Sequence, residues 1–299
     1  MNRPQEIKII PTRKALGAEI EGIDFAYKVP NETKKILINA WIEHLVLLFR
    51  NQNITEQQHI NATHIFGEIQ ISAAKSYYEA NGKKEAMAAT FPEISIVHNL
   101  DSDGNPVILN QGLGSGEVFW HSDNSYINTP PAGSMLYAKI IPPTGGDTCF
   151  SNQYLAYEKL PREILNKIQG KTAVHDSSRD GSGLLRPGIK LPTKLSEVPG
   201  PHHPLIRSHP ISMKKALYLG RKRNYPSQYI QGIPEEESSN ILDFLWDHAC
   251  QEEFIWCHRW KLGDLILWDN RCTMHYRHPF PGEFPRIMHR TLIKGEVPQ

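Results

Sequence analysis

The sequence lacks the features that would direct it to a membrane or to a nucleic acid. Its 33 Lys and Arg residues are balanced by 32 Asp and Glu residues, so no strong electrostatic field favours a polyanionic partner. The first residues contain no apolar core of a signal peptide, and no apolar run approaches the length of a membrane span. We therefore expect a cytoplasmic protein that binds neither nucleic acid nor membrane.

Cysteine is scarce as well. The chain has four cysteines, and none of them forms a Cys-X-X-Cys pair of the kind that binds metal: Cys149, Cys250, Cys257 and Cys272. Because no secretion signal is present, the simplest expectation is that all four are reduced thiols.

With 299 residues the chain can bury a large core, and without an internal repeat we expect one domain over residues 1–299. Short alternating or apolar segments are separated by Gly- and Pro-rich turns, which favours a mainly β, jelly-roll-like sandwich. The segments with a strand pattern are 45–49, 94–99, 118–126, 135–140, 216–219, 253–260 and 265–268. Flanking helices are predicted near residues 31–41, 55–66, 152–169 and 235–250.

Residues 177–204 are rich in Gly, Pro, Ser and charge, and they show no periodicity. A stretch this long inside a compact domain is usually a lid or a mobile insertion. His202 and His203 lie in it, and we expect both to be exposed loop residues rather than ligands. His258, in the strand pattern of residues 253–260, is expected to be structural because nothing pairs it with a metal-binding partner.

His121 and Asp123 are the first candidate site residues. In the predicted strand 118–126, side chains at i and i+2 leave the same face, so both groups would point into one cavity. An imidazole beside a carboxylate supplies two ligands of the facial triad that holds Fe(II). Taken alone, a His-X-Asp pair is common, and a solvated pair at a strand end is the simpler interpretation.

The C-terminal half changes that interpretation, because an ordered series of motifs follows. These are the Gly145-Gly146-Asp147-Thr148 turn, the Gly263-Asp264 turn before an apolar strand, the Trp268-Asp269-Asn270-Arg271 turn, His275, Arg286 and Arg290. Together with His121-X-Asp123, the series resembles the Fe(II)/2-oxoglutarate-dependent dioxygenases of the taurine dioxygenase and 2,4-dichlorophenoxyacetate dioxygenase (TauD/TfdA) family. The resemblance extends from residues 45–50 to Lys294.

The resemblance implies a double-stranded β-helix (jelly-roll) core with flanking helices, and a site for Fe(II), 2-oxoglutarate and O2. His121, Asp123 and His275 would be the metal ligands. The co-substrate 2-oxoglutarate would take two further iron positions through its C1 carboxylate and keto oxygen, and O2 the last. Its distal carboxylate is costly to bury without a partner. We assign it to Arg286, whose planar guanidinium matches a carboxylate, with a hydrogen bond from Thr148.

Arg290 is assigned to the substrate. Arg286 and Arg290 share a face of the predicted strand, so a second inward arginine would add an uncompensated charge unless another anion enters. In the family, the matching arginine binds the acidic group of the substrate, which implies a small organic anion, a carboxylate or a sulfonate. Ser72 and Asn110 are expected to help shape the pocket. Ser72 stands where taurine-specific members carry a histidine, which argues against taurine.

The implied reaction is oxidative decarboxylation of 2-oxoglutarate to succinate and CO2, coupled to hydroxylation of the substrate. Where the hydroxylated carbon carries a heteroatom, the C–O, C–N or C–S bond would be cleaved. Asp123 favours oxygenation, because relatives that halogenate lack this carboxylate. The segments that resemble the dichlorophenoxyacetate group more than the taurine group are 120–126, 135–136, 142–148, 156–161 and 258–261.

Two alternatives stay open. One is an enzyme of the same fold with another outcome, a desaturase or an epimerase. The other is a non-catalytic metal-binding sensor, although the intact His121, Asp123, His275 and Arg286 speak against it. The resemblance also implies a homo-oligomer, a dimer or a tetramer.

Overall fold

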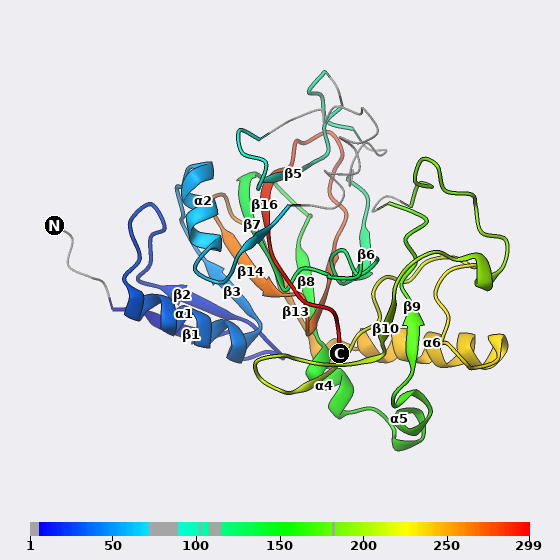
Figure 1. The fold of residues 1–299 in the computed structure, drawn as a ribbon. Coiled ribbons are helices and arrows are strands. Elements are labelled where there is room, and N and C mark those ends of the chain that lie inside the picture. The colour runs from blue at the N-terminus through cyan, green and yellow to red at the C-terminus, as the bar shows by residue number, and fades with distance from the viewer. Residues whose placement is uncertain (1–5, 72–88, 102, 108–114, 181–182) are drawn as a thin grey trace.

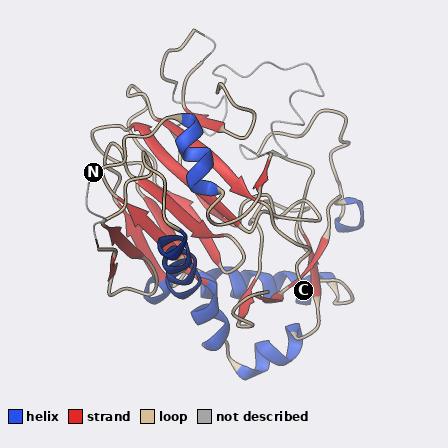
Figure 2. Cartoon of the chain, turned by 60° about the vertical axis from the view of Figure 1, so that its left-hand side comes forward, coloured by secondary structure: helices blue, strands red, loops and turns tan. Residues whose placement is uncertain are grey.

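The computed structural model describes residues 6–71, 89–101, 103–107, 115–180 and 183–299. Within these residues the chain forms a β-sandwich of two sheets (Figure 1). The strands fill the centre of the molecule and the helices lie around them (Figure 2). None of the described helices combines the length and the apolar character that crossing a bilayer requires.

The larger sheet has eight strands, which run mostly antiparallel. They are β1 (Lys8–Pro11), β2 (Ala18–Glu21), β3 (Val46–Phe49), β4 (Ile69–Gln70), β5 (Ser95–His98), β7 (Gly133–Ile140), β14 (Leu265–Asp269) and β16 (Ile287–Ile293). Their spatial order is β1-β2-β3-β14-β7-β16-β4, and β5 also pairs with β16. The pairing of β2 with β3 is parallel.

The smaller sheet has four strands in the order β13-β8-β15-β6. They are β6 (Val118–His121), β8 (Thr148–Asn152), β13 (Ile255–His258) and β15 (Thr273–Arg277). Two short antiparallel pairs lie outside the sandwich: β9 (Thr172–Val174) with β10 (His202–Pro204), and β11 (Ile206–Ser208) with β12 (Lys215–Leu217). The predicted mainly β sandwich is what the structure shows.

The alternation of side chains along β14 explains where the core sits. Ile266 and Trp268 point between the sheets and pack with Phe150 of β8, whereas Leu265 and Leu267 pack on the other face of the larger sheet. A strand covered on both faces has no polar side and appears in the sequence as a continuous apolar run. Each such buried side chain contributes about 1.5–3 kcal/mol to folding.

The helices agree with the predicted segments. They are α1 (Asn31–His44), α2 (Glu56–Thr63), α4 (Gln153–Glu158), α5 (Arg162–Ile168) and α6 (Glu235–Ala249), with 3-10 turns η1 (Leu195–Glu197) and η2 (Glu252–Phe254). At the start of α2, the N–H of Gln58 donates to Thr55 Oγ1 at 3.3 Å and the N–H of Thr55 donates to Gln58 Oε1 at 2.8 Å, a capping box. The helical stretch 152–169 is divided in two at Pro161, which disfavours helical conformation in the residue before it.

The strand predicted over residues 118–126 is shorter than expected. β6 ends at His121, and residues 123–126 form a turn in which Asn124 has a φ of 48°. Asp123 therefore does not lie on the strand, and the argument that it shares a strand face with His121 is wrong. The two side chains meet because the chain turns back after β6.

The expectation of four reduced thiols is wrong for two of them. Cys149 on β8 and Cys257 on β13 form a disulfide. The two are direct partners across the antiparallel ladder, so the sheet brings them side by side although 108 positions separate them in the sequence. Cys250 and Cys272 are free.

The segment 177–204 has more structure than its composition suggests, because it contains η1 and ends in β10. His203 is only 2% exposed, and its Nε2 lies 3.0 Å from the carbonyl of Ile127. The expectation of an exposed loop residue is therefore wrong for His203. His202 is exposed as expected, but it lies on β10 and not in a loop. His258 is structural, as predicted, with Nε2 2.9 Å from an Asp264 carboxylate oxygen.

Candidate active site

His121, Asp123 and His275 lie together between the two sheets. His275, in the middle of β15, is the ladder partner of His121 at the end of β6. Asp123 Oδ1 lies 3.6 Å from His121 Nε2 and 3.8 Å from His275 Nε2. All three side chains are buried, and one ligand atom from each falls within 4.8 Å of the others. The structure thus brings together the three residues predicted to bind the metal.

Long-range hydrogen bonds hold Asp123 in the turn after β6. Its backbone N–H donates to Asn270 Oδ1 at 2.7 Å, and Asn270 Nδ2 donates to the Asp123 carbonyl at 2.9 Å. Ser134 Oγ on β7 donates to Asp123 Oδ2 at 2.7 Å. The other oxygen, Oδ1, faces the two histidines. Asn270 and Ser134 orient the carboxylate in the way that outer hydrogen bonds orient metal ligands.

A buried ion pair fixes the turn between β14 and β15. Arg271 donates to both carboxylate oxygens of Asp269, at 2.9 Å through Nε and 2.6 Å through Nη2, and His209 Nε2 lies 3.0 Å from Oδ2. Burial alone would raise the pKa of Asp269, but Arg271 and His209 hold it below its usual value. The turn presents Asn270 to the site and leads into β15.

Both histidines of the triad are neutral imidazoles. Burial, together with the charge of Arg221, lowers the pKa of His121 to about 4, and burial with the neighbouring His121 holds the pKa of His275 well below its usual value. His121 Nδ1 lies 2.8 Å from the carbonyl of Phe119. Because a carbonyl only accepts, Nδ1 carries the proton and Nε2 keeps a free lone pair. Two neutral imidazoles and one carboxylate are a donor set that fits Fe(II).

Arg290 lies beside the carboxylate of Asp123, with Nη1 3.4 and 3.5 Å from its two oxygens. Burial opposes the ionisation of Asp123, but Arg290 and His275 hold its pKa well below the usual value. The alternation along β16 turns Arg290, like Met288, into the space between the sheets. Arg286, just before β16, lies on the same side.

Arg286 is a buried cation, 4% exposed, that has no ion pair with a carboxylate in the described part of the chain. Its guanidinium carbon lies 6.0 Å from the ring centroids of Trp260 and Phe280. Burial and the neighbouring Arg277 lower the pKa of Arg286 to about 9. A buried charge without a counter-ion is costly, so this position favours an anionic ligand. Thr148 lies at the same end and accepts a hydrogen bond from Trp260 Nε1 at 2.9 Å.

The glycine pair before Thr148 packs against this arginine. Gly146 has a φ of +71°, and a Cβ built there would lie 3.4 Å from Nε of Arg286 and 3.6 Å from its Cδ. A residue with a side chain would be strained in this conformation. The Gly-Gly-Asp-Thr motif therefore allows the turn to cover Arg286 closely while it places Thr148 on β8.

Sequence reasoning missed three polar residues at the site. Arg277 is buried and stands two positions after His275 on β15. Arg221 forms a backbone bridge with His121, and Ser134 donates a hydrogen bond to the Asp123 carboxylate. The alternation from His275 could have pointed to Arg277, whereas no local pattern marks Arg221 or Ser134.

Two of the predicted substrate residues, Ser72 and Asn110, lie outside the described residues. Within the predicted lid, residues 177–204, Arg186 lies against the turn that carries Asp123, because its guanidinium carbon is 4.4 Å from the ring centroid of Tyr126. Arg186 is therefore near one of the residues expected to bind the metal. Movement of the segment stays a prediction.

Comparison with protein families gives a consistent result. A model described as "Taurine catabolism dioxygenase TauD, TfdA family" matches residues 8–292. The alpha-ketoglutarate-dependent 2,4-dichlorophenoxyacetate dioxygenase of Cupriavidus pinatubonensis is 30% identical over 266 residues, which cover 89% of this chain and 90% of that relative. The alpha-ketoglutarate-dependent sulfate ester dioxygenase of Pseudomonas putida is 30% identical over 305 residues, which cover 98% and 91%.

Solved structures are similar over the same length. AAD-2, crystallised in complex with Mn(II) and N-oxalylglycine, superposes with a TM-score of 0.78 at 28% identity and covers 98% of both chains. A taurine dioxygenase from Burkholderia xenovorans superposes with a TM-score of 0.75 at 28% identity, over 98% of this chain and 90% of the other. The similarity therefore includes both sheets and the site between them.

Proposed function

Because the chain belongs to the taurine catabolism dioxygenase TauD, TfdA family and is an Fe(II)- and 2-oxoglutarate-dependent dioxygenase, we propose that it oxygenates a small organic anion, a carboxylate or a sulfonate. The reaction would release succinate and CO2 from 2-oxoglutarate. Where the oxidised carbon carries a heteroatom, breakdown of the product would cleave a C–O, C–N or C–S bond.

Arg290 carries this proposal. Its guanidinium lies beside the metal carboxylate, and its Nε is buried without a hydrogen-bond partner in the described part of the chain. If Asp123 binds a metal ion, its carboxylate shares its negative charge with that ion and attracts the guanidinium of Arg290 less strongly. The planar guanidinium can then donate to two oxygens of an acid group. These contacts support an anionic group on the substrate, held next to the metal ligands.

The opposite end of the site suits the co-substrate. Bound Fe(II) supplies the activation of O2 that is coupled to decarboxylation of 2-oxoglutarate. Arg286 would pair with the distal carboxylate, which gives this buried cation its counter-ion. Because the Thr148 hydroxyl accepts from Trp260 Nε1, its own proton stays available as a donor to the same carboxylate. The two arginines, which are four positions apart in the chain, would thus bind two different anions.

The relatives support oxygenation of an anion. One is named for its action on 2,4-dichlorophenoxyacetate and another for its action on sulfate esters. Asp123 completes the triad, which supports oxygenation over halogenation. The desaturase, epimerase and sensor alternatives are not favoured by any of the relatives named above.

A substrate panel tests the proposal. The Fe(II)-loaded enzyme is supplied with 2-oxoglutarate and O2, and succinate is measured with aryloxyalkanoates, sulfonates, sulfate esters and the neutral amide of each acid. We expect one acid class to stimulate succinate release above the uncoupled rate, and its neutral amides to have no effect. Equal stimulation by an acid and its amide would contradict an anion-binding role for Arg290.

Three further predictions accompany this function. We infer a homo-oligomer, a cytoplasmic location and a pocket shaped in part by Ser72, Asn110 and the lid of residues 177–204. Light scattering on the purified protein tests the first, with a monomer as the contradicting result. Limited proteolysis with and without Fe(II) and 2-oxoglutarate tests the lid, because closure would protect residues 177–204.

A further inference from the structure

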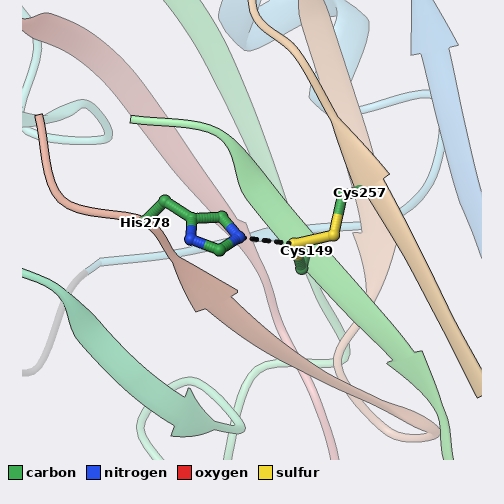
Figure 3. A group of neighbouring side chains, drawn as sticks. All are labelled: Cys149, Cys257 and His278. Carbon is green, nitrogen blue, oxygen red and sulfur yellow. Dashed lines mark hydrogen bonds between the residues drawn. A yellow bond between two sulfur atoms is a disulfide. The ribbon is translucent and has the colours of Figure 1, made fainter. Parts of the chain in front are cut away.

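A second cluster of metal-ligating side chains lies on the outer face of the smaller sheet (Figure 3). Cys149 and Cys257 are ladder partners on β8 and β13, and their sulfur atoms are bonded. His278 follows β15, the other neighbour of β8. Its Nε2 lies 3.4 Å from Cys149 Sγ. The pairing of β13, β8 and β15 therefore brings the three side chains together.

The cluster is open to solvent and separate from the triad. Cys257 and His278 are exposed, and only Cys149 is buried. Along β8, Cys149 points away from its inward neighbours Thr148 and Phe150. The ring of His278 is held edge-on against Tyr276, with the centroids 4.9 Å apart. A reductant or an ion can therefore reach the cluster from outside without passing through the site between the sheets.

A structural disulfide does not account for the histidine. The sulfur of a disulfide accepts hydrogen bonds only weakly, and the pairing of β8 with β13 closes the bond without any help from His278. An imidazole nitrogen beside two cysteine sulfurs is instead the donor set of a thiophilic metal site. The other two cysteines do not share this arrangement: Cys250 and Cys272 are free, and Cys272 lies beside His209 and Asp269 with no second sulfur in that buried group.

We propose that reduction of this disulfide converts Cys149, Cys257 and His278 into a surface site for a thiophilic metal ion such as Zn(II). The three donor atoms lie within 4.8 Å of one another. Tetrahedral Zn(II), with Zn–S of about 2.3 Å and Zn–N of about 2.0 Å, needs donor atoms roughly 3.6 Å apart. The Sγ–Nε2 distance of 3.4 Å is already close to this value. The two freed sulfurs need only rotate apart, and water can fill the fourth position.

The conversion balances with a dithiol or phosphine reductant. A dithiol gives two electrons and two protons to the S–S bond, which becomes two thiols while the reductant becomes a disulfide. A phosphine gives the two electrons and takes the oxygen of a water molecule to become a phosphine oxide, while the two protons of that water complete the two thiols. Binding of Zn(II) as a dithiolate then releases two protons to water, and the neutral imidazole adds its lone pair. The ion would bind at this site only in the reduced protein.

Metal stoichiometry on the full chain tests the proposal. The oxidised protein and the protein reduced with a phosphine are each titrated with Zn(II) against a chromogenic chelator, without O2. We expect the reduced protein to bind one ion more per chain than the oxidised protein. Titration with Co(II) should give a thiolate charge-transfer band in the reduced protein alone, because the His121, Asp123, His275 triad contains no sulfur.

Two variants and a control assign the ligands. His278→Gln keeps both cysteines and should weaken binding of the additional ion at least about tenfold, and Cys257→Ser should abolish it. Cys250→Ser removes a cysteine elsewhere and should leave it unchanged. No additional ion on reduction, or undiminished affinity in His278→Gln, would overturn the proposal. If Cys257→Ser does not fold, the affinity of His278→Gln for the additional ion still tests the proposal. His278 is an exposed side chain, so its substitution should leave the fold intact.

Discussion

The carboxylate of Asp123 divides its two oxygens between different partners. Ser134 donates to Oδ2 at 2.7 Å, while Oδ1 faces His121 and His275. Arg290 Nη1 lies 3.4 and 3.5 Å from the two oxygens. Ser134 therefore fixes Oδ2, and Oδ1 is the oxygen that we expect to bind the metal. The geometry of the triad depends on a serine that is not itself a ligand.

Two variants distinguish the expected metal ligand, Asp123, from Ser134, the residue that orients its carboxylate. Asp123→Ala should abolish Fe(II)-dependent turnover, because it removes the only carboxylate of the triad. Ser134→Ala should weaken Fe(II) affinity by roughly 10–100-fold while some turnover remains, as measured by anaerobic Fe(II) titration. Ser151→Ala, which removes another buried serine hydrogen bond on β8, should leave the affinity unchanged. Full activity of Asp123→Ala would show that the triad is misassigned.

Substitution of Arg286 and of Arg290 should impair the activity of the enzyme in different ways. Arg286→Leu should raise the 2-oxoglutarate concentration needed for half-maximal rate steeply, because a buried carboxylate would lose its partner. Arg290→Leu should keep the uncoupled release of succinate but lose its stimulation by substrate. Both are read from succinate release at varied 2-oxoglutarate, with and without an acid substrate. The same loss in both variants would mean that the roles of Arg286 and Arg290 are wrongly divided.

At the scale of elements, α2 packs a buried histidine against β16. His59 is 1% exposed, and its Nε2 lies 3.3 Å from Thr291 Oγ1. Burial and the neighbouring His289 lower the pKa of His59 to about 3. The unfolded chain therefore binds a proton near pH 6.5 that the folded chain does not bind until about pH 3. Stability is lost as the pH falls through this window.

Chemical denaturation at several pH values measures this effect. The free energy of unfolding should fall between about pH 6.5 and pH 5, with His59 contributing at most about 1.4 kcal/mol per pH unit. His59→Gln should make the fall shallower by up to that amount. An unchanged pH dependence in the variant would show that His59 gains its proton without unfolding.

Local patterns predicted most of the elements but not the end of β6. The apolar runs at β3 and β14 and the capping box of α2 depend on neighbours in sequence, so the sequence alone reveals them. The turn at Asp123 depends on Asn270 and Ser134, which reach it only after the sheets have formed. The disulfide was missed for the same reason, because only the register of β8 and β13 brings its cysteines together.

At the scale of the whole molecule, the site joins the two sheets. His121 and His275 belong to the smaller sheet, and Arg290 belongs to the larger one. Motif order and resemblance selected the triad and both arginines as candidates, since these positions follow one another in the sequence. Their roles at the site stay predictions. Motif order and resemblance could not identify Arg221 or Ser134. These two residues come close to His121 and Asp123 only in the folded chain.

Ligands that contact both sheets should stabilise the folded chain. At concentrations about 100-fold above Kd, binding adds about 2.7 kcal/mol to the free energy of unfolding, which for a chain of this size raises Tm by several degrees. We expect this increase with Fe(II) and 2-oxoglutarate together. In Arg286→Leu only the part due to Fe(II) should remain. An increase of the same size in Arg286→Leu would place 2-oxoglutarate elsewhere.

Anaerobic absorption spectroscopy tests whether 2-oxoglutarate chelates Fe(II) at the triad. We expect wild-type protein with Fe(II) and 2-oxoglutarate to develop the weak visible charge-transfer band of a chelated 2-oxo acid, and Asp123→Ala to show no such band. Fe(II) alone should give no such band. A wild-type protein that binds Fe(II) and shows no band with 2-oxoglutarate would contradict this site assignment, because the co-substrate would then not chelate the metal.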